Sequence, residues 1–136
     1  MIKQGFNIGN RDWYIMVYYN VHTDKELIEV ADILRSVYCK ADIISRAIEV
    51  LSEPNTGLTF TNFDEHLTLI FIGRATSAEQ MYDTIQHELK HAVEHISSYF
   101  DVDPQSEKSA YLQGEIARNM FGAAAMAVCP KCNCEV

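Results

Sequence analysis

The order in which the hydrophobic pattern changes along the chain is the strongest constraint on its fold. The run at residues 12–19 is aromatic and β-branched and would place Trp13, Ile15, Val17 and Tyr19 on one face, which predicts a strand. Residues 58–62 and 66–72 predict two more strands, joined as a hairpin through Asp64 and Glu65. Because helical patterns surround these runs, we expect an α+β fold with a small antiparallel-rich sheet packed against helices.

Helical spacing of apolar residues fills most of the remaining chain. Thr23 and Glu26 form a capping-box pattern that opens a helix, whose apolar stripe reaches Tyr38 and resumes at residues 41–51 after a kink near Lys40. Two further capping boxes, Thr76 with Glu79 and Ser77 with Gln80, begin a helix that we expect to end near Tyr99. A last helix is predicted from Ser106 to Val128, after a break that contains Pro104.

Size and charge exclude several classes of protein. The chain has 136 residues, which suits one domain over residues 1–128, followed by a cysteine-containing tail at 129–136. It carries 11 Lys and Arg against 19 Asp and Glu, a net charge of −8, so we expect no nucleic-acid partner. The first ten residues lack the apolar core of a signal peptide, and the apolar stretch 120–128 is too short to span a membrane. We therefore expect a cytoplasmic protein with no membrane partner.

Residues 87–91 read His-Glu-Leu-Lys-His, an HExxH motif inside a predicted helix. Two histidines four residues apart project from one face of a helix and can bind one metal ion, for which imidazole favours zinc. The intervening Glu88 can then act as general base beside the metal-bound water. On a helical wheel, both histidines lie off the apolar stripe, on a face that we expect a second helix to cover. That stripe consists of Met81, Ile85, Leu89, Ala92 and Ile96.

A catalytic zinc site with two histidines needs a third protein ligand. The downstream candidates are Glu94, His95, Glu107 and Glu115. His95 lies about 12 Å along the helix axis from His87, too far for both to bind one ion, but it can contact substrate. Glu107 is favoured because it begins the last helix after a turn that folds the chain back, and Glu115 is the alternative.

The segments QHELKHAVEH (86–95) and SEKSAYLQGEIA (106–117) together resemble the minimal gluzincin-type zinc metallopeptidases of phages and bacterial mobile elements. In that family a short sheet precedes the HExxH helix, and a Glu in an E-x-x-A-Y/W pattern on the next helix completes the zinc site. Residues 107–111 match this pattern. The resemblance covers about residues 56–120, and the first 55 residues match no motif of the family.

The resemblance implies a zincin-like fold and zinc-dependent hydrolysis of peptide bonds. His87, His91 and Glu107 would hold Zn²⁺, and Glu88 would take a proton from the attacking water and pass it to the leaving amine. Tyr111 or His95 would contact the transition state or the substrate, which would be a peptide or protein. The edge of the strand at 66–72 can pair with an extended substrate, whereas His66 itself is expected to be an ordinary hairpin residue.

Cys129, Cys132 and Cys134 form a second group of candidate ligands. The CxxC spacing lets two thiolates bind one zinc ion, and Cys134 can supply a third. The alternatives are a redox dithiol and a cysteine tail without a metal. For the whole chain, the alternative to a peptidase is a non-catalytic module that keeps the zincin fold and a zinc site to bind or regulate a partner.

Overall fold

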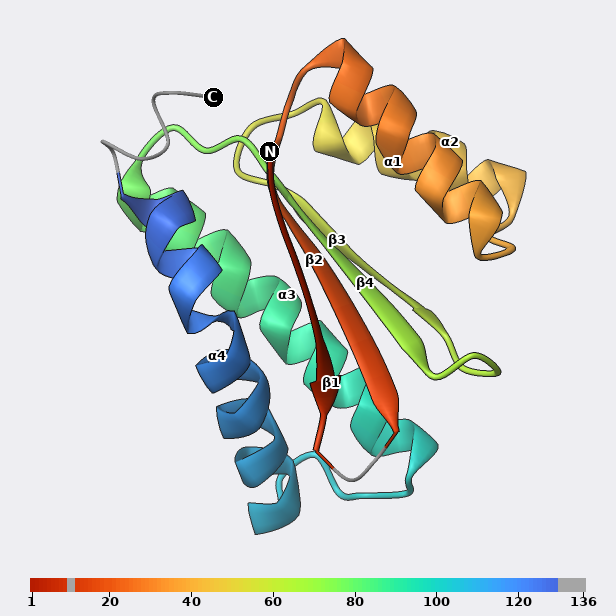
Figure 1. Cartoon of the computed structure of the whole chain (residues 1–136), viewed down its shortest axis with the longest axis vertical. Helices are drawn as coiled ribbons and strands as arrows, with labels where there is room; N and C mark the ends of the chain where they lie inside the picture. Colours follow the sequence, from red (N-terminus) through yellow and green to blue (C-terminus); the bar gives the residue numbers. More distant parts are fainter. Residues whose placement is uncertain (10–11, 130–136) are drawn as a thin grey trace.

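The computed structural model describes residues 1–9 and 12–129 and shows a four-stranded sheet with two helices on each face (Figure 1). Along the chain the elements are β1 (Ile2–Ile8), β2 (Trp13–Val21), α1 (Asp24–Ser36), α2 (Ala41–Leu51), β3 (Gly57–Asn62), β4 (Leu67–Gly73), α3 (Ala78–Tyr99) and α4 (Glu107–Val128). Helices α1 and α2 cover one face of the sheet, and α3 and α4 cover the other. The α+β prediction is confirmed.

The sheet is mixed, and two of its three strand pairs are antiparallel, in agreement with the antiparallel-rich sheet that we expected. Its strand order is β1-β2-β4-β3, in which the two outer pairs are antiparallel and the central pair, β2 with β4, is parallel. A parallel pair requires a long crossover, and here α1, α2 and β3 lie between the two strands. The predicted hairpin is β3 and β4. Since β4 pairs on both sides, the open edge beside α3 belongs to β3 and not to β4.

Strand β1 is an element that the sequence pattern did not reveal. Ile2, Gln4, Phe6 and Ile8 alternate with more exposed residues, but the run includes a glycine and polar side chains on both faces. Its pairing with β2 supplies the hydrogen bonds that make this weakly apolar segment a strand.

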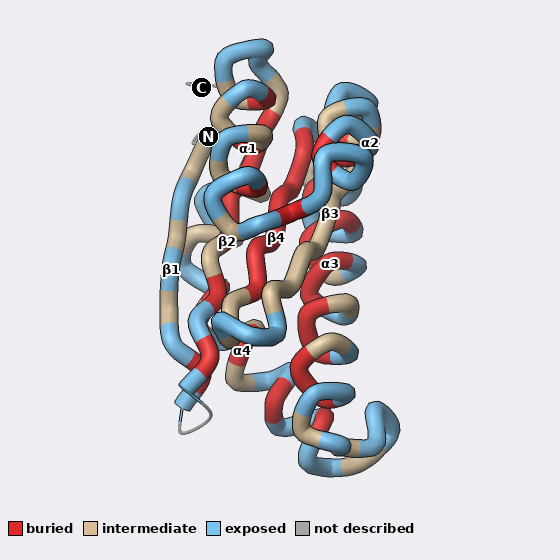
Figure 2. The backbone as a smooth tube through the Cα atoms, turned by 90° about the vertical axis from the view of Figure 1, so that its right-hand side faces the viewer, coloured by how far each residue is buried: buried red, intermediate tan, exposed pale blue. Residues whose placement is uncertain are grey.

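Alternate strand residues enter two separate cores. As predicted, Trp13, Ile15, Val17 and Tyr19 share one face, and all four pack in the core beneath α3 and α4. Leu69 and Phe71 of β4 point the other way, into the core beneath α1 and α2. Burial on both faces explains why β4 reads as a continuous apolar run, which appears as the unbroken buried segment in Figure 2.

The capping box at the start of α1 forms as predicted. The Thr23 hydroxyl accepts from the Glu26 N–H, and the Glu26 carboxylate accepts from the Thr23 N–H. The apolar stripe of this helix does not reach Tyr38, contrary to the prediction. Tyr38 takes a left-handed conformation (φ 64°) and is 84% exposed. This residue ends the first helix, so α1 and α2 are separate helices rather than one kinked helix.

Glu26 gives the fold a specific dependence on pH. Burial opposes its charge, but hydrogen bonds from the backbone of His22 and Thr23 and contact with the Met1 ammonium group outweigh burial and lower its pKa from 4.5 to about 2. Because the folded-state pKa is depressed, this stabilisation is complete above pH 4.5 and is lost as the pH falls towards 2. We expect Glu26→Gln to lower the free energy of unfolding at pH 7 by up to about 3 kcal/mol.

Urea denaturation at pH 7 and at pH 2 measures this effect. The difference between wild type and Glu26→Gln should fall below about 1 kcal/mol at the lower pH, and an unchanged difference there would contradict the assignment. Glu29→Gln is the matched control on the same helix. Glu29 pairs with Lys3 at the exposed surface, so its loss should cost less than about 1 kcal/mol.

Helices α3 and α4 pack side by side on the second face of the sheet. Ser77 caps α3 and Ser106 caps α4, and both helices end where the sequence predicts. The predicted apolar stripe of α3 is buried against the sheet. Helix α3 contacts β3 and β4, whereas α4 contacts β1 and β2. Within residues 1–9 and 12–129, no helix has the length and apolar character needed to cross a membrane.

Candidate metal and hydrolytic site

The two histidines of the HExxH motif meet on the outer side of α3. Their Nε2 atoms lie 3.1 Å apart, and their rings are 4.8 Å apart at an interplanar angle of 78°. Two imidazole nitrogens bound to one tetrahedral zinc at 2.0–2.1 Å would be separated by about 3.3 Å. The pair is therefore already close to the spacing that a shared zinc ion requires.

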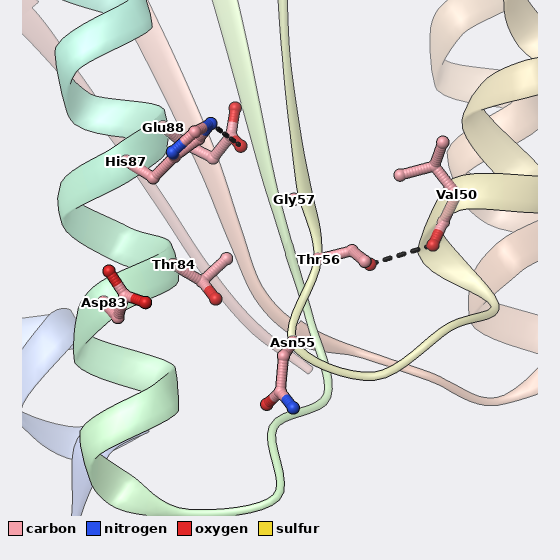
Figure 3. Close-up of a pocket in the computed structure, with 8 residues that line it drawn as sticks. All are labelled: Val50, Asn55, Thr56, Gly57, Asp83, Thr84, His87 and Glu88. Atoms are coloured by element: carbon pink, nitrogen blue, oxygen red, sulfur yellow. Dashed lines mark hydrogen bonds and ion pairs between the residues drawn. The ribbon is translucent and has the colours of Figure 1, made fainter.

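Glu88 turns inward from the same helix and is 4% exposed. The Thr59 hydroxyl of β3 donates to Glu88 Oε1 at 2.7 Å. Glu88 Oε2 lies 3.9 Å from His87 Nε2 (Figure 3). The strand thus holds one carboxylate oxygen and leaves the other beside the histidine pair. This arrangement suits a group that exchanges a proton at the pair.

Gly57, the first residue of β3, makes room for Glu88. A Cβ atom at this position would lie 2.7 Å from Glu88 Cγ and 3.0 Å from the Phe71 carbonyl oxygen. The edge strand therefore fixes the carboxylate in two ways: Gly57 allows its close approach, and Thr59 bonds it. No residue of β3 was a candidate in the sequence, although Thr59 and Thr61 alternate with apolar residues in LTFTN.

The face that carries His87 and His91 is not covered by a second helix, contrary to the prediction. The His87 side chain is 65% exposed, and the face borders the β3 edge while α4 packs over the other half of the sheet. Beside Glu88 lies a hollow of about 290 Å³ between α3 and the start of β3. Its lining consists of Val50, Asn55, Thr56, Gly57, Asp83, Thr84, His87 and Glu88 (Figure 3).

His95 lies one turn beyond His91 and is tied to the sheet. Its Nδ1 is 2.8 Å from the Thr61 hydroxyl, which contacts the Thr68 hydroxyl, and Thr68 accepts from the Trp13 indole N–H. Burial, together with the nearby His91, lowers the pKa of His95. A neutral His95 that accepts at Nδ1 would present an N–H at Nε2, as substrate contact requires.

Glu107 and Tyr111 are not brought to the histidine pair. Ser97 of α3 meets Ser109 of α4, with hydroxyl oxygens 3.4 Å apart, at a point about 15 Å along α3 from His87. Glu107 lies at the exposed start of α4 beyond that contact, and Tyr111 is 76% exposed on α4. The turn after α3 does reverse the chain, but it directs α4 towards β1 and β2 and away from β3.

Glu115, the alternative third ligand, also lies elsewhere. Its carboxylate oxygen would be 2.8 Å from a Cβ at Gly9, which follows β1 at the opposite edge of the sheet from β3. Among the residues that the structure describes, no three His, Cys, Asp or Glu side chains form a group able to hold a metal ion. The arrangement supplies two imidazoles with Glu88 beside them.

The remaining sequence candidates are separate from this site. His66 stacks on Trp13 and bonds Tyr99 through Nε2, which is a packing role in the hairpin. Cys129 is the C-terminal cap of α4, and Cys132 and Cys134 lie outside the described residues. Comparisons with protein-family models, curated proteins and solved structures give no match.

Proposed function

We propose that the chain is a zinc-dependent hydrolase of peptide bonds, with His87 and His91 as metal ligands and Glu88 as general base. One observation carries the proposal. The two Nε2 atoms lie 3.1 Å apart, and a buried carboxylate oxygen lies 3.9 Å from one of them. A purely structural zinc site has no need of a buried carboxylate beside its ligands.

The residues of the chain divide the chemistry between them. Zinc, when bound, would lower the pKa of a water molecule and polarise the substrate carbonyl. Glu88 Oε2 would accept the proton of the attacking water and later deliver it to the leaving amine. The Thr59 hydroxyl holds Oε1 throughout, so the reacting oxygen keeps one position. The β3 edge, which lies beside Glu88, can align an extended peptide by backbone hydrogen bonds.

The ligand set also favours a second candidate, a non-catalytic module that binds zinc and a partner. Catalytic zinc sites ordinarily have three protein ligands, and here the described residues bring together two histidines. Glu107 remains a proposed ligand only if the start of α4, which contacts α3 at Ser97, moves along α3 towards the histidine pair when zinc binds. A module of this kind would bind its partner equally well with or without the Glu88 carboxylate.

Metal removal tests the hydrolase proposal. Zinc-loaded protein is incubated with a mixture of unstructured peptides, and cleavage is followed by mass spectrometry before and after treatment with a chelator. We expect cleavage to stop on chelation and to return when one equivalent of zinc is added, because the water must be activated by the metal. Cleavage that is unchanged by chelation would contradict the proposal. An absence of cleavage, with zinc bound, would favour the binding module.

A further inference from the structure

The hollow beside Glu88 is lined mainly by hydrogen-bond acceptors. It is open enough to admit a side chain, at about 290 Å³, and it borders both His87 and the start of the β3 edge. A peptide held at the proposed site would place one side chain here. The donors and acceptors of the lining indicate which type of side chain fits there.

The two hydroxyl groups of the lining have already used their protons. The Thr56 hydroxyl donates to the carbonyl oxygens of Val50 and Glu53, both at 2.8 Å. The Thr84 hydroxyl donates to the Gln80 carbonyl oxygen at 3.0 Å. A hydroxyl has one proton and two lone pairs, so each of these oxygens can only accept a hydrogen bond from a ligand.

The other polar side chains of the lining are an amide, an imidazole and two carboxylates, and the carboxylates add negative charge. The Asn55 amide is bonded to Thr76, in the loop before α3. Glu88 lines the hollow with a buried carboxylate, and Asp83 stands at its exposed rim, one turn or about 6 Å before His87 along α3. Val50 supplies an apolar wall between these groups.

We propose that this hollow binds the side chain of a lysine or arginine in the substrate. A cationic group with several N–H donors fits a lining of two accepting hydroxyls with the Asp83 carboxylate at its rim, and its methylene groups fit the wall at Val50. Asp83 is the specificity-determining residue, because its charge lies at the outer end of the hollow, away from the hydrolytic pair. The assignment of the bound group as part of a substrate rests on the proposed function.

Peptide binding to the full-length chain tests the proposal. The probes are acetyl-Ala-Ala-Lys-Ala-Ala-amide and the same peptide with norleucine in place of lysine, titrated by NMR with zinc omitted so that cleavage does not interfere. We expect the lysine peptide to bind about 5–10-fold more tightly, which is within the net gain of one ordinary hydrogen bond, and to shift the amide signals of Thr56 and Thr84. Asp83→Asn should reduce the preference to less than about twofold.

Asp64→Asn is the matched control, since it removes the same charge from the turn at the far end of β3 and should leave the preference unchanged. Equal binding of the two peptides by wild type, or a preference that survives Asp83→Asn, would overturn the proposal. The readout needs neither zinc nor cleavage. A lysine preference without zinc-dependent cleavage would therefore refute the hydrolase and leave the pocket assignment standing. Zinc-dependent cleavage without a lysine preference would refute the pocket assignment and leave the hydrolase standing.

Discussion

Glu88→Gln is expected to reduce the rate of peptide cleavage by about 10²–10⁴-fold while the protein keeps its zinc. Glutamine has the shape of glutamate, and its carbonyl oxygen can still accept from the Thr59 hydroxyl, so the contact with β3 survives. It cannot take a proton from water at neutral pH. The measurement is the cleavage rate on a fluorogenic peptide library, together with zinc content and thermal unfolding of each variant.

Glu79→Gln is the control for this substitution, because Glu79 is an exposed residue in the first turn of the same helix. Its cleavage rate should match that of wild type. Unchanged cleavage by Glu88→Gln would contradict the role of general base. Loss of zinc from Glu88→Gln would show instead that Glu88 is a metal ligand.

Gly57→Ala is expected to reduce cleavage and stability together. The added methyl group would lie 2.7 Å from Glu88 Cγ and 3.0 Å from a backbone oxygen of β4, so either the carboxylate or the strand must move. We expect a loss of about 1–3 kcal/mol in the free energy of unfolding, typical of overpacking, and about a 10–100-fold slower cleavage because Oε2 leaves its position. Urea denaturation and initial rates measure the two effects.

Gly114→Ala provides the comparison. Gly114 lies on the exposed face of α4, and a Cβ there meets no atom within 4 Å. The same substitution should therefore stabilise the protein by about 0.5–1 kcal/mol and leave cleavage unchanged. If Gly57→Ala behaved like Gly114→Ala, the close approach of β3 to Glu88 would have no role in positioning the carboxylate.

The parts of this molecule that the sequence predicts are those specified by local pattern. The caps at Thr23 and Ser77 and the apolar stripe of α3 depend on residues three or four apart, and all of them form as predicted. The pairing of the two histidines is also local, because four residues of helix place both side chains on one face.

The features that the sequence did not reveal depend on long-range packing. The parallel pairing of β2 with β4 arises only in the assembled sheet. The strand character of β1 also depends on its pairing with β2, because the β1 sequence is short and contains several polar residues. The position of Glu107 depends on the direction in which α4 leaves the turn, which no motif specifies. Glu88 contacts Gly57 and Thr59, which lie about thirty residues earlier in the chain. The HExxH motif spans only five residues, so it could not predict these contacts.

The most direct test of the hydrolytic centre is the zinc content per chain, measured by elemental analysis on wild type, His91→Ala, Glu107→Gln and Cys132→Ala. The proposed site predicts one zinc in wild type, its loss from His91→Ala, and its retention in Cys132→Ala. In the arrangement described here Glu107→Gln also keeps its zinc, and loss from that variant would mean that α4 moves to complete the site. Zinc that survives His91→Ala and disappears with Cys132→Ala would contradict the central claim and place the metal in the tail.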